Sequence, residues 1–168
     1  RWLEGTNNLG SDQNIPIVPW EEIIDAAEAA NTPGSFTAFI GYEWSSAPEG
    51  NNLHRVVVYR DGKGKANTRI PLSSELNRAP EALWDWMEAY QDETGGHLLA
   101  IPHNGNLSNG LMFDDQRFDG EPLTAEYAER RQRLEPLYEV TQMKGDGEAH
   151  PMLSPDDAFS DFETWDKG

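Results

Sequence analysis

The chain has 168 residues, which is enough for one domain with a hydrophobic core. Its 30 acidic and 13 basic side chains give a formal net charge of -17, which repels phosphate backbones and anionic lipid headgroups, so we expect neither a nucleic-acid nor a membrane partner. The sequence contains no cysteine, which excludes disulfides, thiolate metal ligands and cysteine nucleophiles.

The first half of the chain alternates between helical and extended patterns. Residues 1–19 are rich in Gly, Asn and Pro and are predicted to form a loop or linker tail before an α/β domain over 20–168. Apolar residues at helical spacing predict a helix over 20–30. The run 36–45 is apolar and aromatic on both faces, which is typical of a strand buried on both sides, and the β-branched run 53–60 predicts the next strand.

The second half continues the alternation. Pro80 favours a helix start, and Gly95-Gly96 favours its end. The patterns predict, in order, irregular chain over 62–79, that helix, a short buried strand over 97–103, a polar helix over 124–133, a strand over 137–142 and a helix from 154 to about 165. This order of helices and strands indicates α/β layering.

Three side chains that could bind metal fall at the ends of predicted strands, namely Glu43, His54 and His103. If the strands of Glu43 and His54 form a hairpin, the end of the first lies beside the start of the second. Each residue also has a structural interpretation. Glu43 could lie past the buried part of its strand or pair with Arg55. His54 could be a half-buried strand histidine satisfied by a neighbour, and the chain at His103 could be a plain strand-to-helix connection. Together, the three predict a site for zinc, manganese or iron.

Two loops extend this candidate site. His103 opens a loop dense in Gly and Asn, which is how α/β enzymes build sites at strand ends. The segment 139–150 runs from a predicted strand into a loop that carries Lys144, Glu148 and His150. Glu148 and His150 are either further metal ligands or exposed loop residues, and the pattern leaves both interpretations open.

Six stretches together resemble a large bacterial family known as a domain of unknown function, which is itself similar to the PHP (polymerase and histidinol phosphatase) metal-dependent phosphoesterases. They are GYEWSS, NNLHRVVVYRDG, PEALWDWM, IPHNGNLSNG, YAERRQRLEPL followed by EVTQMKGDGEAHP, and LSPDDAFSDFETWD. The PHP resemblance implies a distorted β/α barrel holding two or three zinc, manganese or iron ions. Gly41-Tyr-Glu43 matches the metal-binding Gly-x-Glu motif of that family, and His54 and His103 match ligands on later strands.

The resemblance also implies hydrolysis of an anionic small molecule, a phosphate ester, by metal-activated water. Asn104 and Lys144 would then hold substrate oxygens. The His-x-His and Asp-x-His motifs of PHP enzymes are absent, so we expect an internal segment of a barrel that is inactive alone and binds metal weakly or not at all. The alternatives are a non-catalytic scaffold and a hydrolase of another bond, such as an amide. No signal peptide is visible, but the chain starts at Arg1, so we expect a soluble protein that is either cytoplasmic or exported.

Overall fold

The computed structural model describes residues 17–147 and 149–161, so the predicted tail lies outside the described residues except for 17–19. For those three residues the prediction is wrong, because they form the start of α1 (Ile17–Ala30). Pro19 stands in the first turn of this helix, where a backbone N–H has no partner within the helix and its loss costs little.

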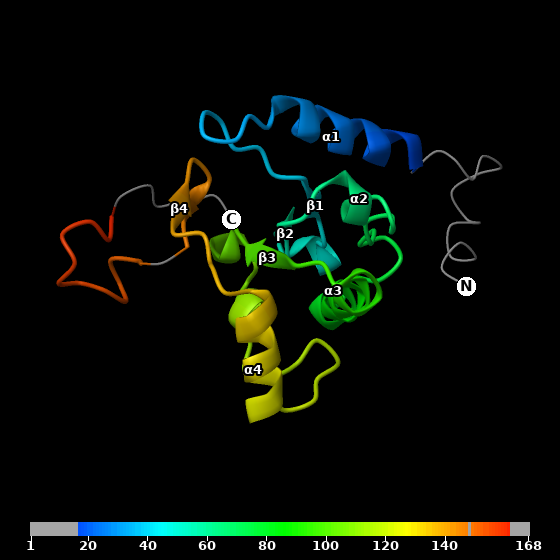
Figure 1. Cartoon of the computed structure of the whole chain (residues 1–168). Coiled ribbons are helices and arrows are strands. Elements are labelled where there is room, and N and C mark those ends of the chain that lie inside the picture. Colours follow the sequence, from blue (N-terminus) through cyan, green and yellow to red (C-terminus); the bar gives the residue numbers. More distant parts are fainter. Residues whose placement is uncertain (1–16, 148, 162–168) are drawn as a thin grey trace.

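The centre of the molecule is a three-stranded sheet in the order β1-β2-β3, shown in Figure 1. Its strands are β1 (Gly41–Trp44), β2 (Arg55–Tyr59) and β3 (Leu98–Pro102), and each neighbouring pair is antiparallel. A β/α barrel closes through parallel strands. The described part of the chain is therefore a mixed α/β fold without a closed barrel, and the barrel expected from the resemblance is not seen in it.

Helices α1 and α3 (Pro80–Thr94) pack on one face of this sheet. The ring of Tyr59 on β2 lies 5.6 Å from the ring of Trp20 on α1 and 5.2 Å from that of Tyr90 on α3. All three side chains are buried. Burial of one large apolar side chain contributes about 1.5–3 kcal/mol, so this aromatic layer holds both helices against the sheet.

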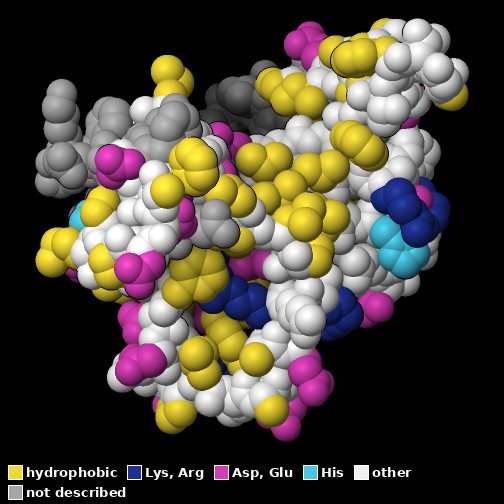
Figure 2. Space-filling model, turned by 90° about the vertical axis from the view of Figure 1, so that its left-hand side faces the viewer, with side chains coloured by type: hydrophobic (Ala, Val, Ile, Leu, Met, Phe, Trp, Pro, Cys, Tyr) yellow, Lys and Arg dark blue, Asp and Glu magenta, His cyan; other side chains and the backbone are white. Residues whose placement is uncertain are grey.

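The opposite face of the sheet is left partly open by the described residues. Val56 is 37% exposed, and the neighbouring apolar side chains Phe39 and Leu137 are 62% and 56% exposed. Hydrophobic side chains gather in the middle of the face seen in Figure 2. The prediction of a strand buried on both faces over 36–45 is therefore wrong. Only its last part forms β1, and the pattern misled because the open face is apolar too.

Local signals set the helix ends as predicted. The helix predicted from Pro80 is confirmed as α3, and Gly95 follows it in the left-handed conformation with φ 59°. The polar helix is confirmed as α4 (Ala125–Leu134), where the Thr124 hydroxyl accepts from the Tyr127 N–H at 3.2 Å. The region predicted to be irregular contains one short helix, α2 (Lys63–Ala66). Short 3₁₀ turns occur at η2 (Pro48–Gly50), η3 (Gly105–Leu107) and η4 (Leu111–Phe113).

The strand predicted over 137–142 is reduced to its last two residues. They form β4 (Thr141–Gln142), which pairs with β5 (Gly145–Asp146) in a separate hairpin. The predicted helix from 154 is wrong as far as residue 161, where the chain forms successive turns, and its remainder lies outside the described residues. Phe159 is 77% exposed there, so no buried apolar face stabilises a helix. Among the described helices, none is both long and apolar enough to cross a membrane.

Candidate metal centre

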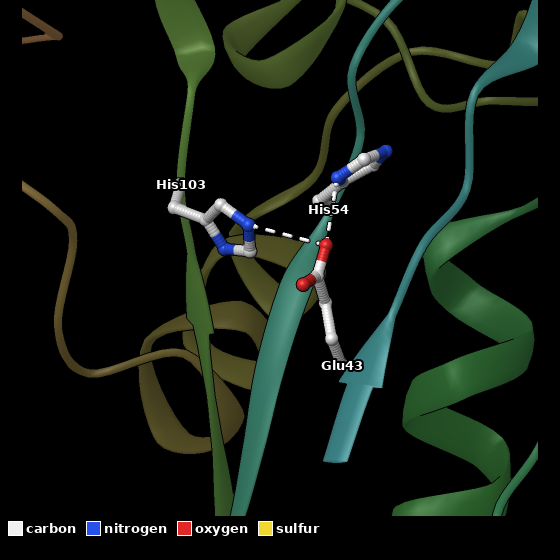
Figure 3. Close-up of side chains that lie close together, drawn as sticks. All are labelled: Glu43, His54 and His103. Atoms are coloured by element: carbon white, nitrogen blue, oxygen red, sulfur yellow. Dashed lines mark ion pairs between the residues drawn. The ribbon is translucent and has the colours of Figure 1, made fainter. Parts of the chain in front are cut away.

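The antiparallel pairing brings three strand ends to the same end of the sheet. Glu43 lies near the end of β1, opposite Val56 of β2. His54 stands just before β2 and His103 just after β3, and the His103 N–H donates to the His54 carbonyl at 3.2 Å. Figure 3 shows the three side chains pointing toward one another from these three strands.

The three side chains converge closely enough to share one ion. Glu43 Oε1 lies 2.9 Å from His54 Nδ1 and 3.5 Å from His103 Nε2. One ligand atom from each residue lies within 4.8 Å of the other two. Ligands bound at 2.0–2.1 Å around a tetrahedral zinc ion stand about 3.3 Å apart, so small side-chain movements suffice for coordination.

The electrostatic surroundings favour the protonation states that bind metal. Burial alone would raise the pKa of the Glu43 carboxyl, but the hydrogen bond from Ser45 and the two nearby histidines outweigh burial and lower it. Burial, together with the charges of His103 and Lys144, lowers the pKa of His54, although the Glu43 carboxylate acts to raise it. An ionised carboxylate beside a neutral imidazole is the form that coordinates a divalent ion.

The structural interpretation of Glu43, a pair with Arg55, does not hold. Arg55 points to the helix-covered face, where its Nε donates to Glu135 at 2.9 Å. Glu43 instead lies on the open face with its side chain 46% exposed. His103 is only 9% exposed, and its Nδ1 has no hydrogen-bond partner within the described residues. The Glu43 carboxylate is therefore left with the two histidines and Ser45.

The turn after His103 holds a buried asparagine side chain that has no hydrogen-bond partner among the described residues. Asn104 adopts a left-handed conformation with φ 55° and is 1% exposed, yet its side-chain amide has no partner among the described residues. An unpaired buried polar group costs about 1–3 kcal/mol. Gly105 follows, and a Cβ at that position would lie 2.1 Å from the hydroxyl of Tyr138. This turn is therefore packed tightly against the segment that leads into β4.

The other three candidate residues, Lys144, His150 and Glu148, differ in their relation to the cluster. Lys144 lines an open pocket of about 400 Å³ together with Glu43 and His103. His150 does not join the cluster, because it is exposed and its Nδ1 accepts from the Met152 N–H at 3.1 Å. Glu148, the remaining candidate ligand, lies outside the described residues.

Sequence reasoning missed Glu139 and Gln142, which line the same pocket. The Glu139 carboxylate accepts from the Asn104 N–H at 3.0 Å and from the Gln142 side chain at 2.7 Å. The available signal was a carboxylate within the apolar run Leu137-Tyr-Glu-Val140, because such a residue needs a partner when it is half-buried.

Comparison with known proteins gives a family match. No curated protein matches the chain significantly, and neither does any solved structure. Residues 5–168 match the model of a family described as a protein of unknown function, DUF3604. Because this match spans nearly the whole chain, the protein belongs to the DUF3604 family.

Proposed function

We propose that this chain carries the metal-binding part of a metal-dependent hydrolase that acts on phosphate esters. The observation that supports the proposal is the convergence of Glu43, His54 and His103, whose ligand atoms lie within 4.8 Å of one another at one end of the sheet. One carboxylate oxygen and two imidazole nitrogens suit zinc, manganese or iron. Three protein ligands with an open position are also the usual set of a catalytic zinc site.

A divalent ion bound there would lower the pKa of a water molecule and polarise the phosphoryl oxygens. The chain's own residues would hold the ion and orient the ester. Asn104 and Lys144 are the candidates for contacts with substrate oxygens, because the Asn104 amide is buried without a partner and Lys144 opens onto the pocket beside Glu43. The resemblance of the Gly41-Tyr-Glu43 motif to the PHP phosphoesterases gives further support for this class of reaction.

Metal titration tests the proposal directly. We expect isothermal calorimetry with zinc or manganese to show one weakly bound ion. His54→Ala and His103→Ala should each reduce its affinity by more than the 10–100-fold that loss of an outer partner costs. The two remaining histidines of the chain provide matched controls. His97→Ala and His150→Ala should leave the affinity unchanged, because neither residue lies in the cluster.

The same proteins, assayed with phosphomonoesters, phosphodiesters and amides, distinguish the alternatives. Metal that binds through His54 and His103 without turnover of any substrate would favour a non-catalytic scaffold, whereas turnover of amides alone would favour a hydrolase of another bond. An affinity that is equal in His54→Ala, His97→Ala and wild type would refute the metal site. Stoichiometric binding of two or three ions would contradict the expectation that the chain carries part of a PHP-type ligand set.

A further inference from the structure

The pocket beside the candidate metal centre has two walls of different origin. One wall consists of Glu43 and His103 at the ends of β1 and β3. The apolar part of the pocket lining comes from Val56 and Ile101. The opposite wall comes from residues 139–144, which contain the approach to β4, β4 itself and the turn toward β5. A ligand held at the metal centre would therefore also contact this hairpin segment.

One carboxylate holds the second wall in place. The Glu139 N–H donates to the Pro102 carbonyl at 3.2 Å, and its side chain accepts from the Asn104 N–H at 3.0 Å. The other side of the same carboxylate receives the Gln142 amide, with Nε2 at 2.7 and 3.0 Å from its two oxygens. Glu139 thus connects the residue that follows His103 to the side chains of the hairpin.

Neighbouring contacts reinforce this connection. The Tyr138 hydroxyl lies directly against Gly105, and the Asn106 side-chain amide donates to the Lys144 carbonyl at 3.0 Å. The Gly/Asn loop after β3 and the hairpin segment are therefore packed together over several residues. Glu139 is the acidic member of this set, and it lines the pocket.

The charges of the pocket indicate what kind of ligand it takes. Its lining carries the carboxylates of Glu43 and Glu139 and the ammonium of Lys144. Without an ion these groups sum to about -1, and with a divalent ion they sum to about +1. An oxyanion is thus attracted only after the metal has bound. Lys144, the basic residue of the lining, lies on the hairpin wall, so the position of that wall decides where the oxyanion is held.

We propose that Glu139 is a positioning residue, which fixes the hairpin wall so that Gln142 and Lys144 meet the oxyanion of a ligand at the metal centre. This proposal rests on the proposed function, because it requires a metal ion bound by Glu43, His54 and His103. Glu139 itself does not belong to the group of ligand atoms within 4.8 Å, so it acts through its neighbours.

Glu139→Gln provides a test, because an electrostatic role and a positioning role of Glu139 predict opposite changes in the affinity for phosphate. The substitution removes one negative charge from the pocket, so a purely electrostatic role predicts tighter binding of inorganic phosphate. A positioning role predicts weaker binding, because the amide nitrogen that replaces Oε1 donates instead of accepting and so loses the 2.7 Å contact that holds the Gln142 Nε2. The double variant Glu139→Gln/Gln142→Glu restores an amide-carboxylate pair with the wild-type charge. Glu129→Gln, an exposed glutamate on α4, is the matched control for charge.

The measurement uses the cobalt-loaded protein, whose visible absorption reports both metal binding and the approach of phosphate. We expect Glu139→Gln to weaken phosphate binding about tenfold with cobalt affinity nearly unchanged, and the reversed pair to recover most of the loss. Phosphate affinity equal to or tighter than that of wild type would overturn the proposal, as would a reversed pair no better than Glu139→Gln. Equal losses of cobalt and phosphate affinity would also overturn it. Wild-type protein that binds no cobalt would instead refute the metal centre, and both proposals with it.

Discussion

The carboxylate of Glu135 is the main polar group inside the helix-covered half of the molecule. It accepts from Arg55 Nε at 2.9 Å, from Trp84 Nε1 at 2.8 Å and from Arg131 Nε at 3.1 Å. The side chains of Arg55 and Glu135 are 2% and 1% exposed, whereas that of Arg131 is 21% exposed. Glu135→Ala would therefore leave the Arg55 guanidinium buried without its counter-ion.

The expected cost follows from this geometry. Removal of one partner of a buried ion pair costs about 3–5 kcal/mol, because the remaining charge is uncompensated. This is a large part of the roughly 5–15 kcal/mol that stabilises a typical domain. Arg131→Ala should lower the free energy of unfolding by less than Glu135→Ala does, because Glu135 keeps Arg55 and Trp84 as partners and because Arg131 is partly solvated. The double variant Arg55→Met/Glu135→Leu should be more stable than Glu135→Ala alone, because it removes both buried charges.

Urea unfolding followed by tryptophan fluorescence measures these differences. With a slope of about 2 kcal/mol per molar urea, Glu135→Ala should lower the midpoint of unfolding by roughly 2 M. Arg131→Ala, with a smaller shift, is the matched control from the same cluster. A midpoint for Glu135→Ala within about 0.5 M of wild type, or a larger loss in Arg131→Ala, would refute the argument that the buried Arg55 charge dominates.

Three further predictions concern the turn after β3, the cap of α4 and the metal centre. Gly105→Ala should weaken metal and phosphate binding, because its Cβ would lie 2.1 Å from the Tyr138 hydroxyl, and Tyr138→Phe in the same protein should recover part of the loss in calorimetry. Thr124→Ala should lower the free energy of unfolding by about 1 kcal/mol in urea titration, since it removes the N-cap hydrogen bond. Metal affinity should fall on acidification, because protons compete with the ion for the His54 ring, and burial lowers the pKa of His54 so that this competition begins below the ordinary histidine range. Calorimetry between pH 5 and 8 measures how metal affinity depends on pH, and a metal affinity that increases as the pH falls would contradict the prediction.

Sequence alone was enough for those features whose causes are local. Pro80 and Gly95 mark the ends of α3, and Thr124 marks the start of α4, because capping and backbone restriction act within one turn of a helix. The positions of Glu43, His54 and His103 beside predicted strand ends also depend on local patterns. The assumed hairpin of β1 and β2, which the structure has, brings Glu43 and His54 together, whereas His103 joins them through the pairing of β2 with β3.

Tertiary structure alone decided which face of the sheet is covered and which carboxylates meet. β2 carries apolar side chains on both faces, with Val57 and Tyr59 on one and Val56 and Val58 on the other, so its pattern could not show that helices pack on only one of them. Arg55 pairs with Glu135 across 80 residues of sequence, and Glu139 reaches Asn104 across 35. Contacts between such distant residues depend on how whole elements pack, whereas the periodicity of a sequence reports only the surroundings of each element by itself.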